Sequence, residues 1–402
     1  MACYIETKNK KDCCGCSSCK QICPKNCITM EYDQQGFYYP KIQEEKCVNC
    51  GRCISVCPLT DTNKSYLHNV NTAQVFGGYI TDEAARVKST SGGGFTAMVH
   101  AFCDENYAVF GAEMDSSFRV FHSCVFRESD IDKFRRSKYL QSNIGNCYQQ
   151  AKELLDNGKK VLFSGTPCQI AGLYSYLVGD RENLLTVDLV CHGVPSPKWF
   201  HKLKADLENK HKSRVTWVEF RNKDNNHWDN SQMVWHLENG KKIKRIDEPF
   251  FSAWLSGLAV RPVCCECIFA SKSRVGDVTL GDLWGVHHFA PKLYADNRGT
   301  SLIMVNTDKG MQQFGKIKGS LAYEKVEIDQ AAKHNNQLVS PIKQNSSYED
   351  FMKDIDALEL SELRKKYFPK SNYAVLLFQK FVSRKTKTRL GRIYKAMRNK
   401  IR

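Results

Sequence analysis

Along the middle of the chain, segments with the apolar pattern of a buried strand alternate with segments that have the apolar and polar pattern of a helix. Short apolar runs predict buried strands at residues 73–80, 107–112, 161–164, 185–191 and 301–306. Longer stretches with helical periodicity predict helices at residues 94–105, 144–157, 169–177 and 197–209. This alternation predicts an α/β domain over residues 73–345, in which helices cover the faces of a mixed sheet.

Three segments differ from this alternating block. Residues 215–244 carry β-type residues around Asn and Gly turns, which predicts a small antiparallel insertion. Residues 61–72 are polar and predict a linker. Residues 346–402 predict a helical tail that is polar at first and basic towards its end.

Residues 1–60 contain the pattern C-x2-C-x2-C-x3-C-P twice. The two runs are Cys13, Cys16, Cys19 and Cys23, and Cys47, Cys50, Cys53 and Cys57. This spacing is that of bacterial two-cluster ferredoxins, in which the fourth cysteine of each run binds the other 4Fe–4S cluster. We therefore predict an α+β ferredoxin-like domain at residues 1–60, in which Cys57 completes the first cluster and Cys23 the second.

Zinc and disulfides are the alternatives for these cysteines. Zinc ribbons use paired C-x2-C units rather than runs of four. Disulfides need an oxidising compartment, and the polar, cysteine-rich N-terminal segment does not resemble a secretory signal. We expect iron–sulfur clusters and a reducing, cytoplasmic setting.

Composition narrows the class further. Hydrophobic residues make up 42% of the 402 residues, and no apolar run reaches the ~18 residues that span a bilayer. The net charge is +16, but residues 363–402 contain fourteen Lys or Arg and no Asp or Glu, which leaves +2 for the rest. The basicity therefore belongs to the tail. Because no recognition module accompanies it, we expect no nucleic-acid partner.

The basic tail has three interpretations that periodicity alone does not separate. Apolar residues recur on one helix face, at Leu390, Ile393, Tyr394, Met397 and Ile401. Such a helix can make peripheral contact with an anionic membrane, or dock an acidic redox partner such as ferredoxin. It can also pack its apolar stripe on its own domain.

Four more cysteines follow predicted strands or form a pair. Cys191 ends a predicted apolar strand, and Cys168 follows another strand after a tight turn, at the entrance to a predicted helix. Ligands of open α/β sheets bind outside the carboxyl ends of strands. Cys264 and Cys267 form a C-x2-C unit. Together these four thiols predict a third 4Fe–4S cluster, with zinc or ordinary buried cysteines as alternatives. Neighbouring Cys14, Cys27 and Cys265 break the spacing and are predicted to be spare.

Several motifs, each weak alone, together resemble the coenzyme F-420 hydrogenase/dehydrogenase beta-subunit family, with an N-terminal 2x(4Fe-4S) ferredoxin-type domain. They are residues 91–95 (S-G-G-G-F), 137–142 (S-K-Y-L-Q-S), 165–169 (G-T-P-C-Q), 191–193 (C-H-G), Cys264 with Cys267, 281–285 (G-D-L-W-G) and 299–301 (G-T-S). With the cysteine runs they extend from residue 13 to about residue 306. The resemblance implies FAD in the α/β domain and electron passage between iron–sulfur centres and that flavin.

The residues themselves support a flavin site through two features. Three glycines before a helix let backbone N–H groups approach a phosphate. Lys88, Arg135, Arg136 and Lys138 are candidates to neutralise a pyrophosphate. The alternative is a flexible glycine loop among solvated charges. The predicted flavin residues are Ser91, Gly92, Gly93, Gly94, Phe95, Lys138, Tyr139, Gly165, Thr166, Gly299, Thr300 and Ser301.

Acid–base candidates are few. His192 follows a predicted cluster ligand and is the candidate to protonate a substrate near the flavin, the alternative being a histidine that only hydrogen-bonds the backbone. Asp277 and Asp282 flank a short strand, where we expect them to fix turns.

The combined prediction is an iron–sulfur flavoprotein oxidoreductase with two or three 4Fe–4S clusters and FAD. Related members reduce a deazaflavin or tetrapyrrole intermediates, and others lie among polysaccharide-synthesis genes, so the resemblance leaves the small-molecule substrate open. The alternatives are a non-catalytic electron-transfer subunit of a larger redox complex and a zinc-stabilised interaction module.

Overall fold

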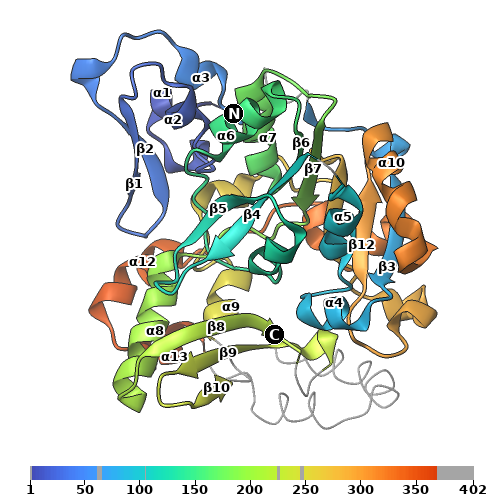
Figure 1. Ribbon diagram of the computed structural model, residues 1–402. Coiled ribbons are helices and arrows are strands. Elements are labelled where there is room, and N and C mark those ends of the chain that lie inside the picture. The colour runs from blue at the N-terminus through green and yellow to red at the C-terminus, as the bar shows by residue number, and fades with distance from the viewer. Residues whose placement is uncertain (1, 61–65, 105, 224–226, 245–248, 369–402) are drawn as a thin grey trace.

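The computed structural model describes residues 2–60, 66–104, 106–223, 227–244 and 249–368. At its centre lies one eight-stranded mixed sheet with helices on both faces (Figure 1). The predicted mixed α/β architecture is therefore confirmed. No helix within these ranges is both long enough and apolar enough to cross a membrane. The basic part of the predicted tail, from residue 369 onwards, lies outside the described residues.

The large sheet has the strand order β13-β3-β12-β11-β7-β6-β4-β5. Strands β11, β7, β6 and β4 are parallel, whereas the outer strands pair antiparallel with their neighbours. The carboxyl ends of the four parallel strands therefore meet at one edge. The bounds are β3 (Gln74–Ile80), β4 (Tyr107–Met114), β5 (Val120–Val125), β6 (Lys160–Ser164), β7 (Leu184–Leu189), β11 (Val278–Asp282), β12 (Ser301–Val305) and β13 (Leu321–Lys325).

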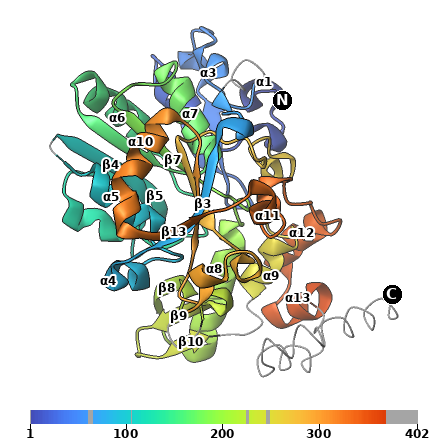
Figure 2. The ribbon, with the colours of Figure 1, turned by 90° about the vertical axis from the view of Figure 1, so that its right-hand side faces the viewer.

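Helices bury both faces of this sheet, as Figures 1 and 2 show. Along β6, Leu162 packs towards α5 and α10, whereas Val161 and Phe163 pack towards α6 and α7. Successive strand side chains point to opposite faces, which explains why the strands read as continuous apolar runs. The helices on the sheet are α4 (Glu83–Lys88), α5 (Gly94–Phe102), α6 (Cys147–Asp156), α7 (Pro167–Leu177) and α10 (Asp308–Ile317).

A second core lies beside the large sheet. The predicted insertion is confirmed as a three-stranded antiparallel sheet of order β10-β9-β8. Trp199 and Phe351 are fully buried in this core, with ring centroids 5.1 Å apart. Its elements are α8 (Pro197–His211), β8 (Val215–Asn222), β9 (Gln232–Leu237), β10 (Lys242–Lys244), α9 (Pro249–Leu255), α12 (Tyr348–Ala357) and α13 (Leu360–Tyr367); α11 (Ile328–Ala332) lies with a smaller core.

The N-terminal part consists of short helices and one hairpin. The hairpin turn is stabilised by the Asp33 carboxylate, which accepts bonds from the backbone N–H groups of Gln35 and Phe37 (both 2.9 Å). The Ser18 hydroxyl donates to the Gly172 carbonyl of α7 (2.8 Å), so this part docks directly on the sheet helices. The elements are α1 (Tyr4–Thr7), α2 (Ser18–Ile22), β1 (Ile28–Tyr32), β2 (Tyr38–Ile42) and α3 (Arg52–Ser55).

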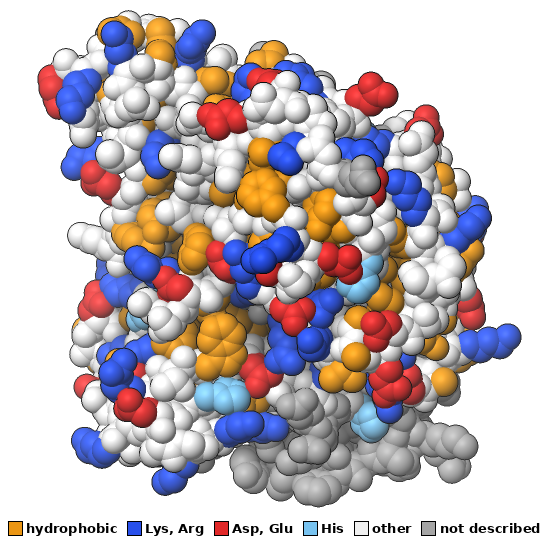
Figure 3. Space-filling view, viewed as in Figure 1, with side chains coloured by type: hydrophobic (Ala, Val, Ile, Leu, Met, Phe, Trp, Pro, Cys, Tyr) orange, Lys and Arg blue, Asp and Glu red, His pale blue; other side chains and the backbone are white. Residues whose placement is uncertain are grey.

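On the face shown in Figure 3, basic and acidic side chains are interspersed over the described surface. This agrees with the near-neutral charge expected for the chain before residue 363.

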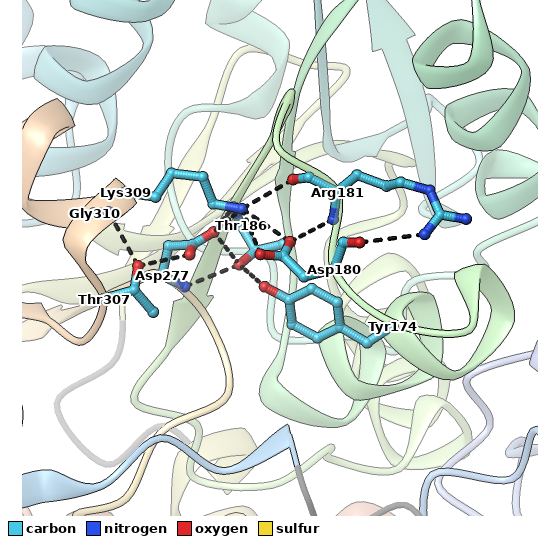
Figure 4. A network of polar contacts seen from close by, with 8 residues as sticks. All are labelled: Tyr174, Asp180, Arg181, Thr186, Asp277, Thr307, Lys309 and Gly310. Atoms are coloured by element: carbon cyan, nitrogen blue, oxygen red, sulfur yellow. Dashed lines mark hydrogen bonds and ion pairs between the residues drawn. The ribbon is translucent and has the colours of Figure 1, made fainter.

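A buried carboxylate joins three elements of the large sheet (Figure 4). Asp277 is 1% exposed and accepts hydrogen bonds from the backbone N–H and hydroxyl of Thr186 (2.8 and 2.9 Å) and from the hydroxyl of Thr307 (2.7 Å). Lys309 lies 3.7 Å from the same carboxylate. The Asp277 carboxylate thus links Thr186 of β7 and Thr307 at the start of α10 to the residue before β11.

Asp277→Ala is expected to lower the free energy of unfolding by about 3 kcal/mol, because it leaves several buried donors without an acceptor. The matched control is Asp180→Ala. Asp180 pairs with the same Lys309 at 2.8 Å but is 56% exposed, so its loss should cost less than about 1 kcal/mol. Denaturant midpoints of the two variants measure the difference. Equal midpoints would contradict the role given to Asp277.

Candidate iron–sulfur and flavin sites

The four cysteines predicted to hold the first cluster line one cavity. They are Cys13, Cys16, Cys19 and Cys57. The loop turns tightly around the cavity because Gly15 and Ser17 have φ angles of 72° and 65°. The backbone N–H of Gly15 points at the Cys13 sulfur (3.3 Å). Four thiols around one cavity are the donor set of a 4Fe–4S cube, so the residues present fit this group.

The second predicted group lies nearer the solvent. Its members are Cys23, Cys47, Cys50 and Cys53, of which Cys50 is exposed and the others are half-buried. Cys27, predicted to be spare, lies among them: its sulfur is 3.3 Å from that of Cys23. The hydrogen bond with Cys23, assisted by Cys47, raises the pKa of Cys27 to about 11. The second group therefore has one more thiol beside it than the spacing predicted.

The third group gathers at the carboxyl edge of the parallel strands. Cys168 lies in the first turn of α7, which a capping box formed by Thr166 and Gln169 begins. Cys191 follows β7 by two residues, whereas the apolar pattern predicted a strand that ends on Cys191 itself. The other two members, Cys264 and Cys267, come from the short helical turn η7 (Pro262–Glu266) and the residue after it.

The thiols of this third group influence one another. Burial raises the pKa of Cys191 to about 12, with Cys168 and Cys267 adding to the effect. Burial likewise raises the pKa of Cys267 to about 11. Backbone N–H groups of Gly193 and Val194 point at the sulfurs of Cys191 and Cys264 (both 3.4 Å). Ionising these buried thiols requires a cationic partner, and cluster iron is one.

Across the described ranges, no group of three or more His, Cys, Asp or Glu side chains has the arrangement that holds a single metal ion. A 4Fe–4S cluster needs a different arrangement of ligands from that of a single metal ion, because each of its four irons binds a different thiolate.

Cys14 connects the first and third groups. Its thiol lies near those of Cys16 and Cys168, and these neighbours, together with burial, raise the pKa of Cys14 well above its ordinary value. A Cβ on Gly172 would lie only 3.0 Å from the Cβ of Cys16, so α7 and the first cysteine loop are in close contact. The two groups, far apart in sequence, are therefore neighbours in the fold.

The predicted glycine loop meets the start of β12. The Ser301 hydroxyl accepts from the backbone N–H groups of Gly92 (3.1 Å) and Gly94 (3.3 Å), and the Ser91 hydroxyl donates to the Thr300 carbonyl (2.9 Å). The structure thus brings together most of the predicted flavin residues. They are Ser91, Gly92, Gly93, Gly94, Phe95, Gly299, Thr300 and Ser301.

A lysine that the sequence did not single out joins this loop. The Lys223 ammonium donates to the carbonyl oxygens of Arg86 (3.1 Å), Ser91 (3.3 Å) and Arg298 (3.0 Å). Burial lowers the pKa of Lys223 to about 8. The loop therefore has a cationic side chain beside it.

The remaining predicted flavin residues lie elsewhere. The Lys138 ammonium donates to the carbonyls of Lys133 (2.7 Å) and Arg135 (2.8 Å), and burial lowers the pKa of Lys138 to about 7. Gly165 and Thr166 lie beside Cys168, where the Thr166 hydroxyl is 3.2 Å from the Cys168 sulfur. These residues do not join the glycine loop.

Tyr139 and His192 are brought together by Trp254. The ring centroids of Tyr139 and Trp254 are 4.7 Å apart, and those of His192 and Trp254 are 5.3 Å apart. Within the described part of the chain, His192 Nε2 is buried without a hydrogen-bond partner. Burial lowers the pKa of His192, although a contact with Gln337 opposes this. His192 thus places a buried imidazole next to Cys191 of the third cysteine group.

Two residues besides Lys223 and Trp254 were not singled out from the sequence, Cys3 and Arg261. Cys3 lines the first cavity, and its proximity raises the pKa of Cys57. Cys14, predicted to be spare, lies between two groups. Arg261 is fully buried beside Cys13. In the sequence, Arg261 is marked only by its position next to Pro262 and just before the C-x2-C unit. That position did not predict a contact with the first cysteine run.

Two parts of the chain match known protein families. Residues 158–331 match the family described as the C terminus of the coenzyme F420 hydrogenase/dehydrogenase beta subunit, and residues 12–60 match the 4Fe-4S dicluster domain. No curated protein matches the chain. Among solved structures, one chain of the F420-reducing NiFe hydrogenase complex from Methanosarcina barkeri, studied by xenon derivatization, is similar. The identity is 17%, the similarity covers 74% of this chain and 94% of that chain, and the TM-score is 0.46.

Proposed function

We propose that this chain, which belongs to the coenzyme F420 hydrogenase/dehydrogenase beta-subunit family and carries a 4Fe-4S dicluster domain, passes electrons between iron–sulfur clusters and FAD. The family makes it an oxidoreductase-type subunit. When bound, the clusters exchange single electrons, and the flavin exchanges a hydride equivalent with an organic substrate. The residues proposed to hold three clusters are the three cysteine groups described above.

The observation that carries this proposal is the docking of the first cysteine loop on α7. The Ser18 hydroxyl donates to the Gly172 carbonyl (2.8 Å), and a Cβ on Gly172 would lie 3.0 Å from the Cβ of Cys16, so the first group adjoins the helix that carries Cys168. Electron transfer needs such proximity between centres. A ferredoxin-type domain tethered away from the α/β domain would not offer it.

The exposed second group is the proposed point of access for an external electron carrier. Cys50 is exposed, whereas Cys13 and Cys16 of the first group are 9% and 7% exposed. A protein partner such as a ferredoxin therefore approaches the second group most closely. A reducing, cytoplasmic setting suits this exchange, because exposed cluster cysteines are sensitive to oxidation.

The loop of residues 91–95 and the start of β12 are the proposed flavin site. Ser301 pairs with Asp282 across the sheet and Leu280 pairs with Leu189, so this loop lies at the same sheet edge as Cys191. The loop's close packing leaves no room for side chains, and Lys223, whose ammonium donates to three carbonyl oxygens here, adds a positive charge beside the loop. His192 is the proposed proton donor, and a deazaflavin of the kind that names the family is the proposed substrate class.

Iron, acid-labile sulfide and flavin content of anaerobically purified protein test the proposal. We expect about twelve irons and about one FAD per chain, together with a flavin absorption band that bleaches when a reduced ferredoxin is added. About eight irons would remove the third site. Clusters without any flavin would favour the relay subunit, and colourless protein with zinc would refute the proposal.

A further inference from the structure

One buried arginine spans the first and third cysteine groups. Arg261 directly precedes the turn that carries Cys264, and none of its surface is exposed. Its Nε donates to the carbonyl oxygen of Cys13 (2.9 Å), 248 residues away in the sequence. A single cationic side chain therefore extends from the third group into the loop of the first.

The charge of Arg261 has only neutral hydrogen-bond partners. One Nη donates to the side-chain carbonyl of Gln141 (2.9 Å) and the other to the carbonyl oxygen of Tyr38 (2.8 Å). The guanidinium also lies 4.3 Å from the centroid of the Tyr39 ring. Among the residues that the structure describes, no carboxylate forms an ion pair with it. An unpaired buried cation is costly, so a negative partner is expected nearby.

The adjoining cysteine groups provide that negative partner when they hold clusters. Four thiolates give a 4Fe–4S cube a net negative charge, which increases on reduction. We propose that Arg261 is the shared counter-charge of the first and third cluster sites and raises the reduction potentials of both. The inference rests on the proposed function, since it requires clusters in both groups. Arg261 acts here through charge and position, without contact with a substrate.

Arg274 provides the contrast within the same chain. It is 2% exposed and lies close enough to Cys191 and Cys267 to influence both thiols. Unlike Arg261, it has a carboxylate partner, Asp188, at 3.5 Å. Its charge is therefore already balanced within the protein, and it has no contact with the loop of Cys13 in the hydrogen bonds described.

Two substitutions remove the net charge in different ways. Arg261→Gln deletes the guanidinium, whereas Gln141→Glu leaves it in place and gives it a carboxylate partner of nearly the same shape. The buried arginine keeps that carboxylate ionised. In redox titrations followed by electron paramagnetic resonance, each variant is expected to lower the equilibrium constant for reduction of the first and third clusters at least tenfold. This change lowers the reduction potential by ~59 mV for a one-electron couple. The exposed second cluster should keep its potential.

Two controls separate charge from packing. Arg261→Lys keeps the charge and should stay closer to the wild-type potentials than Arg261→Gln does. Arg274→Gln should leave the first cluster unchanged. Wild-type potentials for the first and third clusters in Gln141→Glu protein with full iron content would overturn the inference, and so would an equal shift in Arg261→Lys. If Arg261→Gln does not fold, Gln141→Glu alone decides. If the purified wild-type protein contained no iron, this result would refute the proposed function and, with it, the inference about Arg261.

Discussion

Cys267→Ala is expected to reduce the iron content from about twelve to about eight atoms per chain, with a parallel loss of sulfide. The physical reason is that a cube needs four thiolates, and this substitution leaves three at the third group. Cys267 directly follows the turn that carries Cys264. Its electrostatic interaction raises the pKa of the Cys191 and Cys264 thiols. Iron and sulfide analysis of anaerobically reconstituted protein measures the loss, and resonances of the other two clusters should persist.

Cys265→Ala is the matched control for this experiment. Cys265 is the neighbour of Cys264 but lies outside the C-x2-C spacing, and burial raises the pKa of its thiol to about 11. Its substitution should leave both iron and sulfide unchanged. Equal iron content in the two variants would remove the third cluster from the proposal, while the first two would stand.

Gly92→Ala is expected to reduce the flavin content at least tenfold while the iron content stays near the wild-type value. A Cβ at this position would lie 2.5 Å from the carbonyl oxygen of Gly78 and 2.6 Å from the backbone nitrogen of Ser301. Both are backbone atoms of strands, so the loop itself must move. Moving it breaks the bonds from Gly92 and Gly94 to Ser301 and displaces the loop proposed to hold the flavin. Flavin released by denaturation, measured by fluorescence, gives the content per chain.

Gly315→Ala serves as the control for a glycine substitution as such. Gly315 lies in α10, and a Cβ added there meets no atom within 4 Å. We expect wild-type flavin and iron content in this variant. If Gly92→Ala protein keeps its iron and also retains flavin at the wild-type ratio, the glycine loop is not the flavin site.

The alternation of short apolar runs with helical segments was sufficient to predict the mixed α/β fold. Strand β6 illustrates why: Val161 and Phe163 face one core and Leu162 the other, so that both sheet faces are apolar. Cys168, in the first turn of the helix that follows β6, and Cys191, two residues after β7, lie close to the strand ends that the same pattern predicted. The pattern gave no indication of β5, which pairs antiparallel with β4 at the edge of the sheet.

The candidate site was less predictable because its contacts join distant segments. Lys138 carries the charge expected of a phosphate ligand, yet its ammonium bonds carbonyls of its own turn. Lys223 has the same charge and no motif around it, but the packing of the small sheet brings it to Ser91. Residue type was therefore a poor guide here, because the direction of a long side chain depends on the groups packed around it.

By itself, the sequence determined the two cysteine runs, their spacing and the layered fold, because these depend on residues close together in the chain. The tertiary structure alone decided that the Cys14 thiol meets Cys168, and that the Arg261 guanidinium reaches the carbonyl of Cys13. Such contacts join segments that are far apart in sequence. They form only when whole elements dock, and the free energy of that docking comes from buried surface that no local pattern records.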